Sequence, residues 1–128
     1  MSTDDKQTFE TFPNPHPEND YSMTITTNEF SCLCPVTGRA DYATITIDYA
    51  PGERIVELKN LRDYLGSFRN EPTFHEDITN RILNDLVAAT RPRRMDVTAD
   101  FNIRGGLHAV VTAHYVNHAS KGDEPGGR

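Results

Sequence analysis

The spacing of hydrophobic and polar residues changes along the chain, and each change predicts a new element. Residues 42–49 (YATITIDY) alternate apolar and polar side chains and are rich in β-branched and aromatic residues, which is typical of a strand. Pro51 and Gly52 then indicate a turn, and residues 54–58 resume an extended apolar pattern. These two segments predict a β-hairpin with a short loop.

Helical spacing starts at about residue 60 and occurs in two stretches. In the first stretch, apolar side chains recur at i, i+3, i+4 and i+7; they are Leu61, Tyr64, Leu65 and Phe68. Pro72 disfavours helical geometry at the residue before it, so a second helix is predicted to follow. Thr73 and Glu76 have the spacing of a capping box that would begin this helix, and Pro92 lies just beyond its end. Its predicted buried face consists of Ile78, Ile82, Leu83, Leu86 and Val87.

Two more strands are predicted after the helices. Alternating apolar positions cover residues 95–103 and 107–116, and Arg104-Gly105-Gly106 between them has the composition of a turn. The predicted order is therefore strand, strand, helix, helix, strand, strand. Two hairpins on either side of a helix pair predict an α+β domain, with a four-stranded antiparallel sheet and both helices on one face.

The two ends of the chain differ from this patterned region. Residues 1–20 and 117–128 are polar and show no period, so we expect two mobile arms around a single domain at residues 21–116. The whole chain of 128 residues has room for one modest core, and only 36% of its residues are hydrophobic. A chain this polar can depend on subunit contacts to bury enough apolar surface, so we expect a homo-oligomer.

Charge and composition exclude several classes of protein. The net charge is -6, which argues against direct binding of nucleic acid, because backbone binding depends on clustered Lys and Arg. No stretch approaches the roughly 18 apolar residues of a membrane span, and the N-terminal residues have no apolar signal core. We therefore expect a cytoplasmic protein with no membrane partner. Cys32 and Cys34 are too close in sequence for an ordinary disulfide, so their thiols are expected to be reactive, metal-binding or buried.

Cys34 is the first candidate for chemistry. It precedes a turn marked by Pro35 and Gly38, and Asp41 follows at the start of the next predicted strand. A turn can bring the thiol and the carboxyl group into one pocket, where a nucleophile beside a proton donor suits attack on an electrophilic carbon. From these residues alone, a buried structural cysteine and a carboxylate that only forms a turn remain open.

His75 and Glu76 form the second candidate site, at the start of the second predicted helix. Glu76 either caps this helix or receives hydrogen bonds from a ligand there. Zinc is a weaker reading: Cys32, Cys34 and His75 lack the usual Cys-x2-Cys spacing and a second pair of ligands, so no metal is expected. The chain also lacks the glycine-rich signatures GxGxxG and GxxxxGK[ST].

Four ordered segments together resemble one known family. SCLCPVTGRADYATI, VELKNLRDYLGSFRN, FHED and RGG, within about Glu29 to Tyr115, are similar to the single-domain NADPH-dependent 7-cyano-7-deazaguanine reductases, the nitrile reductases of queuosine biosynthesis. The resemblance implies the tunnelling fold (T-fold) for a catalytic domain at residues 21–116. It also implies ring-forming homo-oligomers, as single or stacked rings, with active sites between subunits. The implied reaction, part of tRNA modification, reduces the nitrile of 7-cyano-7-deazaguanine (preQ0) to an aminomethyl group (preQ1).

The same resemblance implies roles for individual residues. Cys34 would attack the nitrile carbon and form a covalent thioimide, and Asp41 would be the proton donor. His75 and Glu76 would bind the substrate, because a carboxylate can accept two N–H groups from a guanine-like edge. A second substrate-binding stretch corresponds to Val56, Glu57 and Leu58.

The cofactor motif of the family also has a counterpart in this chain. Lys59 and Arg62 match its two basic positions, so the resemblance implies NADPH as the cofactor. Asn60 and Asp63 depart from the motif. Read without the resemblance, Lys59 and Arg62 would only be a solvated helix face.

Three other functions remain as alternatives. Archaeal relatives on the same fold add ammonia to the nitrile on preQ0-modified tRNA, as amidinotransferases, but lack the cofactor motif. Zinc-dependent cyclohydrolases also occur on the T-fold, and a pterin- or purine-binding module without catalysis is the third possibility. Retention of most of ELKNLRDY and the acidic net charge favour the reductase.

Overall fold

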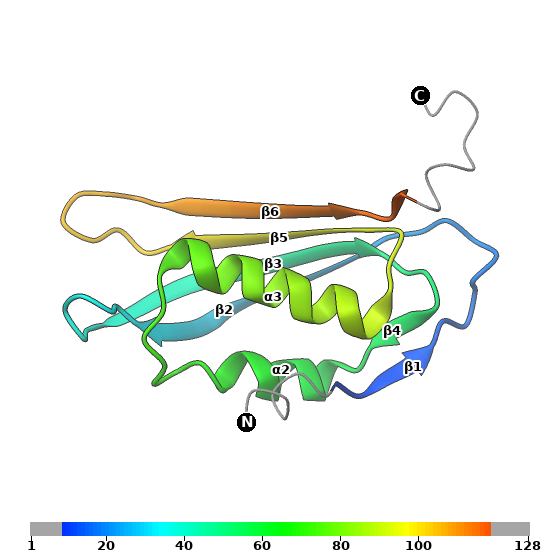
Figure 1. The fold of residues 1–128 in the computed structure, drawn as a ribbon, viewed down its shortest axis with the longest axis horizontal. Helices are drawn as coiled ribbons and strands as arrows, with labels where there is room; N and C mark the ends of the chain where they lie inside the picture. The colour runs from blue at the N-terminus through cyan, green and yellow to red at the C-terminus, as the bar shows by residue number, and fades with distance from the viewer. Residues whose placement is uncertain (1–8, 119–128) are drawn as a thin grey trace.

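The computed structural model describes residues 9–118, whereas residues 1–8 of the predicted N-terminal arm and residues 119–128 of the predicted tail lie outside the described residues. Its elements are β1 (Thr11–Pro13), β2 (Met23–Leu33), β3 (Ala40–Ala50), β4 (Arg54–Val56), α2 (Leu58–Gly66), α3 (His75–Thr90), β5 (Arg94–Phe101) and β6 (Val110–Val116). The main sheet is antiparallel with the order β2-β3-β5-β6, and β1 pairs with β4 apart from it (Figure 1). Neither helix within residues 9–118 is long and apolar enough to cross a membrane.

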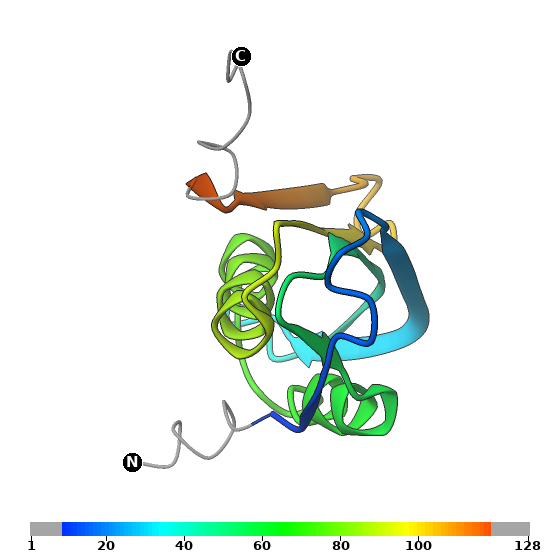
Figure 2. The ribbon, with the colours of Figure 1, turned by 90° about the vertical axis from the view of Figure 1, so that its right-hand side faces the viewer.

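The hydrophobic core lies between the main sheet and the two helices. In Figure 2 the sheet curves around this core, with α3 and α2 both on its inner side. Alternation places every second side chain of β3 and β5 on that side; these buried residues are Ile45, Ile47, Tyr49, Met95, Val97, Ala99 and Phe101. The helices contribute the predicted apolar faces, of which all but Val87 are fully buried. The predicted α+β class, with helices on one face of a four-stranded antiparallel sheet, is confirmed.

The first predicted hairpin is wrong. β3 pairs with β2, from Met23 opposite Tyr49 to Leu33 opposite Ala40, and residues 54–56 pair with β1 instead. The apolar alternation of β2 is broken by threonines and by a register shift between Thr27 and Phe30, which explains why the pattern did not predict this strand. β4 has three residues and is too short to form the ladder that β3 requires.

A strand that the pattern did not predict lies within residues 1–20. β1 is held next to the β3–β4 turn by Asn14, a buried polar side chain. Asn14 Nδ2 donates to the Gly52 carbonyl at 2.9 Å, and Asn14 Oδ1 accepts from the Tyr21 hydroxyl at 2.7 Å. Because a buried amide must be hydrogen-bonded, this one side chain fixes the path of the segment.

The two helices begin at different places from those predicted. α2 starts at Leu58 because the Glu57 carboxylate accepts from the backbone N–H groups of Lys59 (3.1 Å) and Asn60 (2.7 Å). The capping box predicted for α3 is wrong, since the N-cap residue is Phe74 and its side chain makes no cap hydrogen bond.

The reason for the shifted start of α3 lies in β2. The backbone N–H of Thr73 donates to the Leu33 carbonyl at 3.0 Å, and Leu33 N–H donates to the Glu71 carbonyl at 3.1 Å. This short parallel pairing around Pro72 keeps Thr73 extended, so the helix begins after it. The Thr73 hydroxyl instead lies 3.3 Å from Asp77 Oδ2. The same pairing ties the entry of α3 to the end of β2.

The turn after β3 sets the first prediction. An ideal Cβ on Gly52 would lie 2.4 Å from the carbonyl oxygen of Arg91, a backbone atom just past α3. We expect Gly52→Ala to lower the free energy of unfolding by about 1–3 kcal/mol, because the two segments would have to separate. Urea unfolding followed by circular dichroism measures this change.

Gly66→Ala is the matched control. A Cβ on Gly66, the last residue of α2, would meet nothing within 4 Å. We expect this variant to be as stable as the parent or up to about 1 kcal/mol more stable, because alanine has the higher helix propensity. Equal stability of the Gly52→Ala variant and the parent would contradict the close packing of this turn.

Candidate active site

Three segments that are distant in sequence meet at one end of the sheet. They are the β2–β3 turn, the N-terminus of α3 and the β5–β6 loop (Figure 1). The turn is closed by two backbone hydrogen bonds of 2.8 Å, from Cys34 N–H to the Arg39 carbonyl and from Gly38 N–H to the Cys34 carbonyl. Gly38 has φ +76°, a conformation that favours glycine. The turn therefore holds Cys34 in a defined position at the end of β2.

The two cysteines have opposite surroundings. The side chain of Cys34 is half-buried, and hydrogen bonds from the Thr37 hydroxyl and from the backbone at Thr37 and Val36 lower the pKa of its thiol. Cys32 is fully buried, and burial, followed by the charge of Asp41, raises the pKa of its thiol to about 11. The thiolate is the nucleophilic form, so Cys34 suits attack on an electrophile and Cys32 suits the core.

Asp41 is the buried charge of this end of the molecule, with 6% of its surface exposed. His75 Nε2 lies 3.2 Å from its Oδ2, and Arg104 Nη1 lies 2.9 Å from its Oδ1. Arg104 also donates to the Ala40 carbonyl at 2.8 Å. The His75 ring stacks on Phe101, with centroids 3.7 Å apart and an 8° angle between the planes. The carboxylate is thus compensated by α3 and by the β5–β6 loop, as a buried charge requires.

Cys34 lies in the turn that leads into β3, and Asp41 is the second residue of that strand, where it contacts His75. The negative charge of Asp41 acts against ionisation of Cys34, because by itself it raises the pKa of that thiol. Glu76 is next to His75 in the first turn of α3, where its side chain is exposed to solvent at the positive end of the helix dipole. A ligand over Cys34 can meet donors and acceptors from all three segments.

The remaining predicted site residues lie elsewhere. Val56, Glu57, Leu58, Lys59 and Arg62 belong to β4 and the first half of α2, which begins at the opposite end of the molecule (Figure 1). Val56 is buried, the Glu57 carboxylate caps α2, and the Leu58 side chain is half exposed. A single chain does not bring this group next to Cys34.

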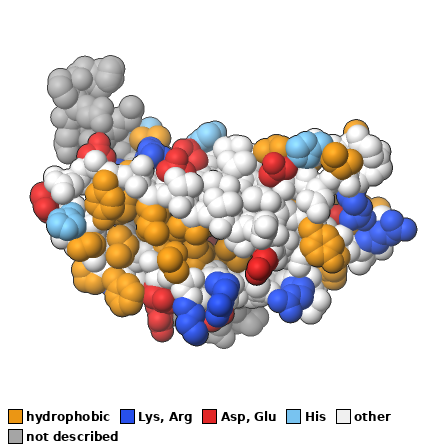
Figure 3. Space-filling model, turned by 180° about the vertical axis from the view of Figure 1, so that it is seen from behind, with side chains coloured by type: hydrophobic (Ala, Val, Ile, Leu, Met, Phe, Trp, Pro, Cys, Tyr) orange, Lys and Arg blue, Asp and Glu red, His pale blue; other side chains and the backbone are white. Residues whose placement is uncertain are grey.

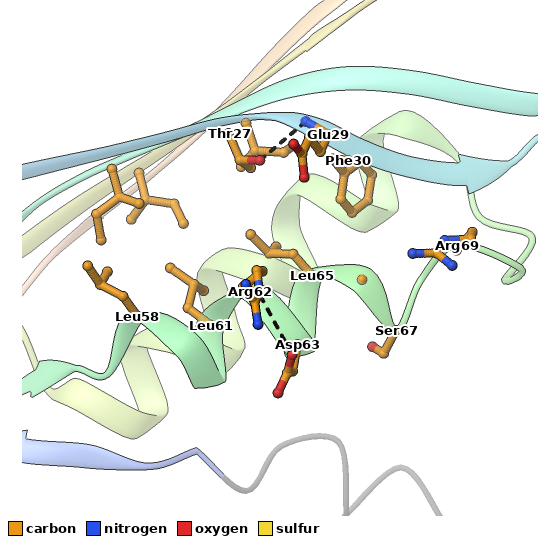
Figure 4. Close-up of a pocket in the computed structure, with 14 residues that line it drawn as sticks. Thr27, Glu29, Phe30, Leu58, Leu61, Arg62, Asp63, Leu65, Ser67 and Arg69 are labelled. Carbon is orange, nitrogen blue, oxygen red and sulfur yellow. Dashed lines mark hydrogen bonds and ion pairs between the residues drawn. The ribbon is translucent and has the colours of Figure 1, made fainter.

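A groove runs beside this second group. It is a cavity of about 570 Å³ between β2 and α2, with an apolar wall and charged side chains along its rim (Figure 4). In Figure 3 the molecule seen from behind carries a broad gathering of apolar side chains, bordered by basic ones. The apolar wall includes Ile25, Phe30, Leu58, Leu61 and Leu65.

The basic residues of α2 are exposed, and Arg62 lines this groove. Lys59 Nζ lies 3.7 Å from Asp63 Oδ2, and Arg62 Nε lies 3.9 Å from Asp63 Oδ1. Because exposed pairs at these distances contribute little, Asp63 reduces the local positive charge without locking either cation. Both cations are therefore accessible to a phosphate group.

Reasoning from sequence missed two side chains of the site. Arg104 was predicted only as part of a turn, and Thr37 was not considered. Gly105 and Gly106 have φ values of +59° and +80°, so the sequence RGG indicates a tight loop. It does not indicate which residue Arg104 contacts. The link between Arg104 and Asp41 depends on the pairing of β3 with β5, which no local pattern contains.

The domain has an antiparallel sheet covered by two helices. At one end of this sheet it carries the half-buried thiol of Cys34 and the compensated carboxylate of Asp41. Such a domain is suited to nucleophilic catalysis by cysteine. Within residues 9–118, no group of three or more His, Cys, Asp and Glu side chains is arranged to hold a metal ion. The family model described as "QueF-like protein" matches residues 40–120. The chain belongs to this family.

Relatives with high sequence identity carry a common name. The NADPH-dependent 7-cyano-7-deazaguanine reductase of Thermomicrobium roseum is 61% identical over 115 residues, which covers 90% of each chain. The protein of the same name from Alkalilimnicola ehrlichii is 55% identical, over 90% of this chain and 89% of its own length. That of Anaeromyxobacter sp. (strain K) is 50% identical over 99% of both chains. The resemblance stated from the sequence is confirmed.

A solved structure confirms the fold. The crystal structure of the archaeosine synthase QueF-Like in the apo form superposes with a TM-score of 0.68, over 73% of this chain and 91% of that chain. At 20% sequence identity, this likeness concerns the fold alone. The α+β architecture is that of the T-fold, as the resemblance implied.

The contact between Arg104 and Asp41 sets the second prediction. We expect Arg104→Met to lower the free energy of unfolding by about 1–2 kcal/mol, because the buried carboxylate loses a charged donor while the half-exposed arginine is replaced at similar length. Thermal and urea unfolding measure the loss. Arg39→Met, at an exposed position of the neighbouring turn, is the matched control and should change stability by less than about 0.5 kcal/mol. Equal effects of the two substitutions would contradict the role of Arg104.

Proposed function

We propose that this chain is an NADPH-dependent nitrile reductase that converts preQ0 to preQ1 in queuosine biosynthesis, with Cys34 as its nucleophile. The observation that carries the proposal is 50–61% identity, over at least 90% of the chain, to proteins named as this reductase. The geometry at Cys34 and Asp41 supports it, because it supplies the nucleophile and the proton donor that the reaction needs.

The first chemical step belongs to Cys34 and Asp41. The Cys34 thiol gives its proton to the Asp41 carboxylate, the resulting thiolate adds to the nitrile carbon, and one π bond of the C≡N group breaks as the nitrogen takes that proton from Asp41. The product of this addition is a thioimide on Cys34, with a C=N bond that accepts hydride more readily than a nitrile does. His75 and Arg104 hold the Asp41 carboxyl group in place during the transfer.

NADPH, when bound, supplies the hydrides, and the four-electron change from nitrile to amine consumes about two NADPH per substrate. Lys59 and Arg62 fit a phosphate-bearing cofactor, since both are exposed cations on one helix and Arg62 lies at the rim of an apolar groove. Asn60 and Asp63, which depart from the cofactor motif, leave these two cations in place.

Substrate recognition is assigned to both ends of the molecule. Glu76, in the first turn of α3, accepts N–H groups from the guanine-like edge, and His75 contacts the ring beside it. The stretch from Val56 to Leu58 provides the second substrate contact. A ligand that lacks these N–H groups would leave the Glu76 carboxylate without hydrogen-bond donors. Such a ligand would therefore bind more weakly.

The separation of the two groups supports assembly into a homo-oligomer. A second copy can place its Val56–Leu58 stretch and its α2 cations beside Cys34, completing a site that one chain leaves open. The apolar groove between β2 and α2 offers surface for such a contact, and β2 and β6 are the edge strands of the main sheet within residues 9–118. We propose a ring of subunits, single or stacked, acting in the cytoplasm without direct contact to nucleic acid.

NADPH consumption is the test of this function. Mixing the protein with preQ0 and NADPH should oxidise about two NADPH per preQ0, and Cys34→Ala should abolish the oxidation. Loss of NADPH absorbance measures the rate and the stoichiometry. Cys32→Ala is the matched control: it removes the buried thiol, and turnover should persist in the fraction that remains folded.

Other outcomes would favour the alternatives. Turnover that requires ammonia and not NADPH would contradict the reductase and favour an amidinotransferase. About one equivalent of tightly bound zinc in the purified protein, together with no NADPH oxidation, would favour a cyclohydrolase. Binding of preQ0 that Cys34→Ala leaves unchanged, without any oxidation, would favour a binding module.

A further inference from the structure

Tyr49 carries a polar atom into the core of the sheet. Its side chain is fully buried near the end of β3, a strand with neighbours on both sides, where it lies opposite Met23 of β2 and Met95 of β5. The hydroxyl oxygen accepts a hydrogen bond of 3.0 Å from the backbone N–H of Val56. Because a buried polar group is costly unless it is hydrogen-bonded, this pair joins the central part of the sheet to β4.

The chain reverses between Tyr49 and Val56. The turn is held from outside by Asn14, whose Nδ2 donates to the Gly52 carbonyl at 2.9 Å. It brings Val56 back beside a residue seven positions earlier in the sequence. Val56 is the last residue of β4, and Glu57 is the N-cap of α2. The Tyr49 hydroxyl therefore holds the chain at the point where β4 ends and α2 is about to begin.

The N-terminal segment holds the same point from its other side. β1 pairs with β4, and the Glu57 N–H donates to the Glu10 carbonyl at 3.4 Å. The Glu10 N–H donates in turn to Asn60 Oδ1 at 3.2 Å, in an exposed contact where water can replace a lost partner. The contact between Tyr49 and Val56 is buried, so loss of the hydroxyl would leave an N–H group without a partner.

The stretch that is anchored in this way is the one that the proposed function assigns to the substrate, residues 56–58. The Val56 side chain is buried, and the Glu57 carboxylate accepts from two backbone N–H groups at the start of α2. Half of the Leu58 side chain is exposed, and Lys59 follows it in the helix. Because the Glu57 cap ties these residues together, a shift at Val56 would move the exposed part of the stretch as well.

We propose that Tyr49 is a positioning residue of the substrate site: through its hydrogen bond to the Val56 N–H, its hydroxyl fixes residues 56–58 where they bind preQ0. Tyr49 is fully buried in the chain and acts through Val56. The proposal rests on the proposed function for the identity of the ligand. Whether the hydroxyl holds the stretch can be measured without substrate or NADPH, so the two ideas can fail separately.

Hydrogen exchange followed by mass spectrometry is the first test, in the parent, Tyr49→Phe and Tyr64→Phe. Phenylalanine keeps the ring and removes only the hydroxyl. In Tyr49→Phe, the amides of residues 54–57 should exchange about threefold to tenfold faster, because one of them has lost its partner, while α3 keeps the parent rates. Tyr64→Phe is the matched control. Tyr64 is also largely buried, but its hydroxyl donates to Asp85 Oδ2 at 2.6 Å and joins α2 to α3, so exchange at residues 54–57 should stay unchanged.

Equilibrium binding of preQ0 is the second test. In a Cys34→Ala background, which prevents a covalent adduct, Tyr49→Phe should weaken binding by about threefold to tenfold and Tyr64→Phe should leave it unchanged. With Cys34 present, KM for preQ0 should rise in Tyr49→Phe while kcat changes little, since the nucleophile and Asp41 are intact. Both phenylalanine variants should unfold at a lower urea concentration, so a loss of stability alone would not produce the difference between them.

The outcomes separate the two ideas. Parent-like exchange at residues 54–57 in Tyr49→Phe, or equal exchange there in the two phenylalanine variants, would overturn the role of Tyr49 whatever the activity. Faster exchange with unchanged preQ0 affinity, in an enzyme that oxidises NADPH with preQ0, would also overturn it. Faster exchange in Tyr49→Phe, when the parent neither binds preQ0 nor oxidises NADPH, would support the anchoring of the stretch by Tyr49 and overturn the proposed function.

Discussion

The buried carboxylate of Asp41 is the constraint on which this end of the molecule depends. A charge with 6% exposure is stable only when donors compensate it, and here they come from α3 and from the β5–β6 loop. The contacts that the Asp41 carboxylate requires therefore fix the positions of His75 and Arg104, which lie 34 and 63 residues away in sequence. Cys34 lies on the turn that leads into the same strand, so the proposed nucleophile is joined to this network through the start of β3.

The two ends of the fold carry different groups that the proposed reaction needs. One end holds the thiol and the proton donor, and the other holds an apolar groove with exposed cations on α2. Since a covalent intermediate must be reduced where it forms, the proposed assembly of copies would be part of the chemistry. The low apolar content of the chain agrees with this, because contacts between copies would bury surface that the single core leaves exposed.

Sequence patterns predicted the parts of the fold that depend on regular periods. The helix faces around Leu61 and Ile82 and the strands β3 and β5 follow from periodicity because their buried faces are continuous. β6 follows from its place after the RGG turn, although only Ala113 of that strand is buried. β2 was missed because a bulge and several threonines break its alternation, and without it the hairpin was assigned to the wrong partner. Cys34 and Asp41 were proposed as a pair because they are close in sequence, whereas Arg104 reaches Asp41 only through the pairing of strands, which local patterns do not contain.

The central claim is that Cys34 forms a covalent bond to the nitrile carbon, and intact-protein mass spectrometry tests it most directly. The protein is incubated with preQ0 in the absence of NADPH and then digested to locate any modification. Since addition to a nitrile has no leaving group, we expect a mass increase equal to the whole substrate, located on Cys34 and absent in Cys34→Ala. No adduct, an adduct on Cys32, or an increase smaller than the substrate mass would contradict the account.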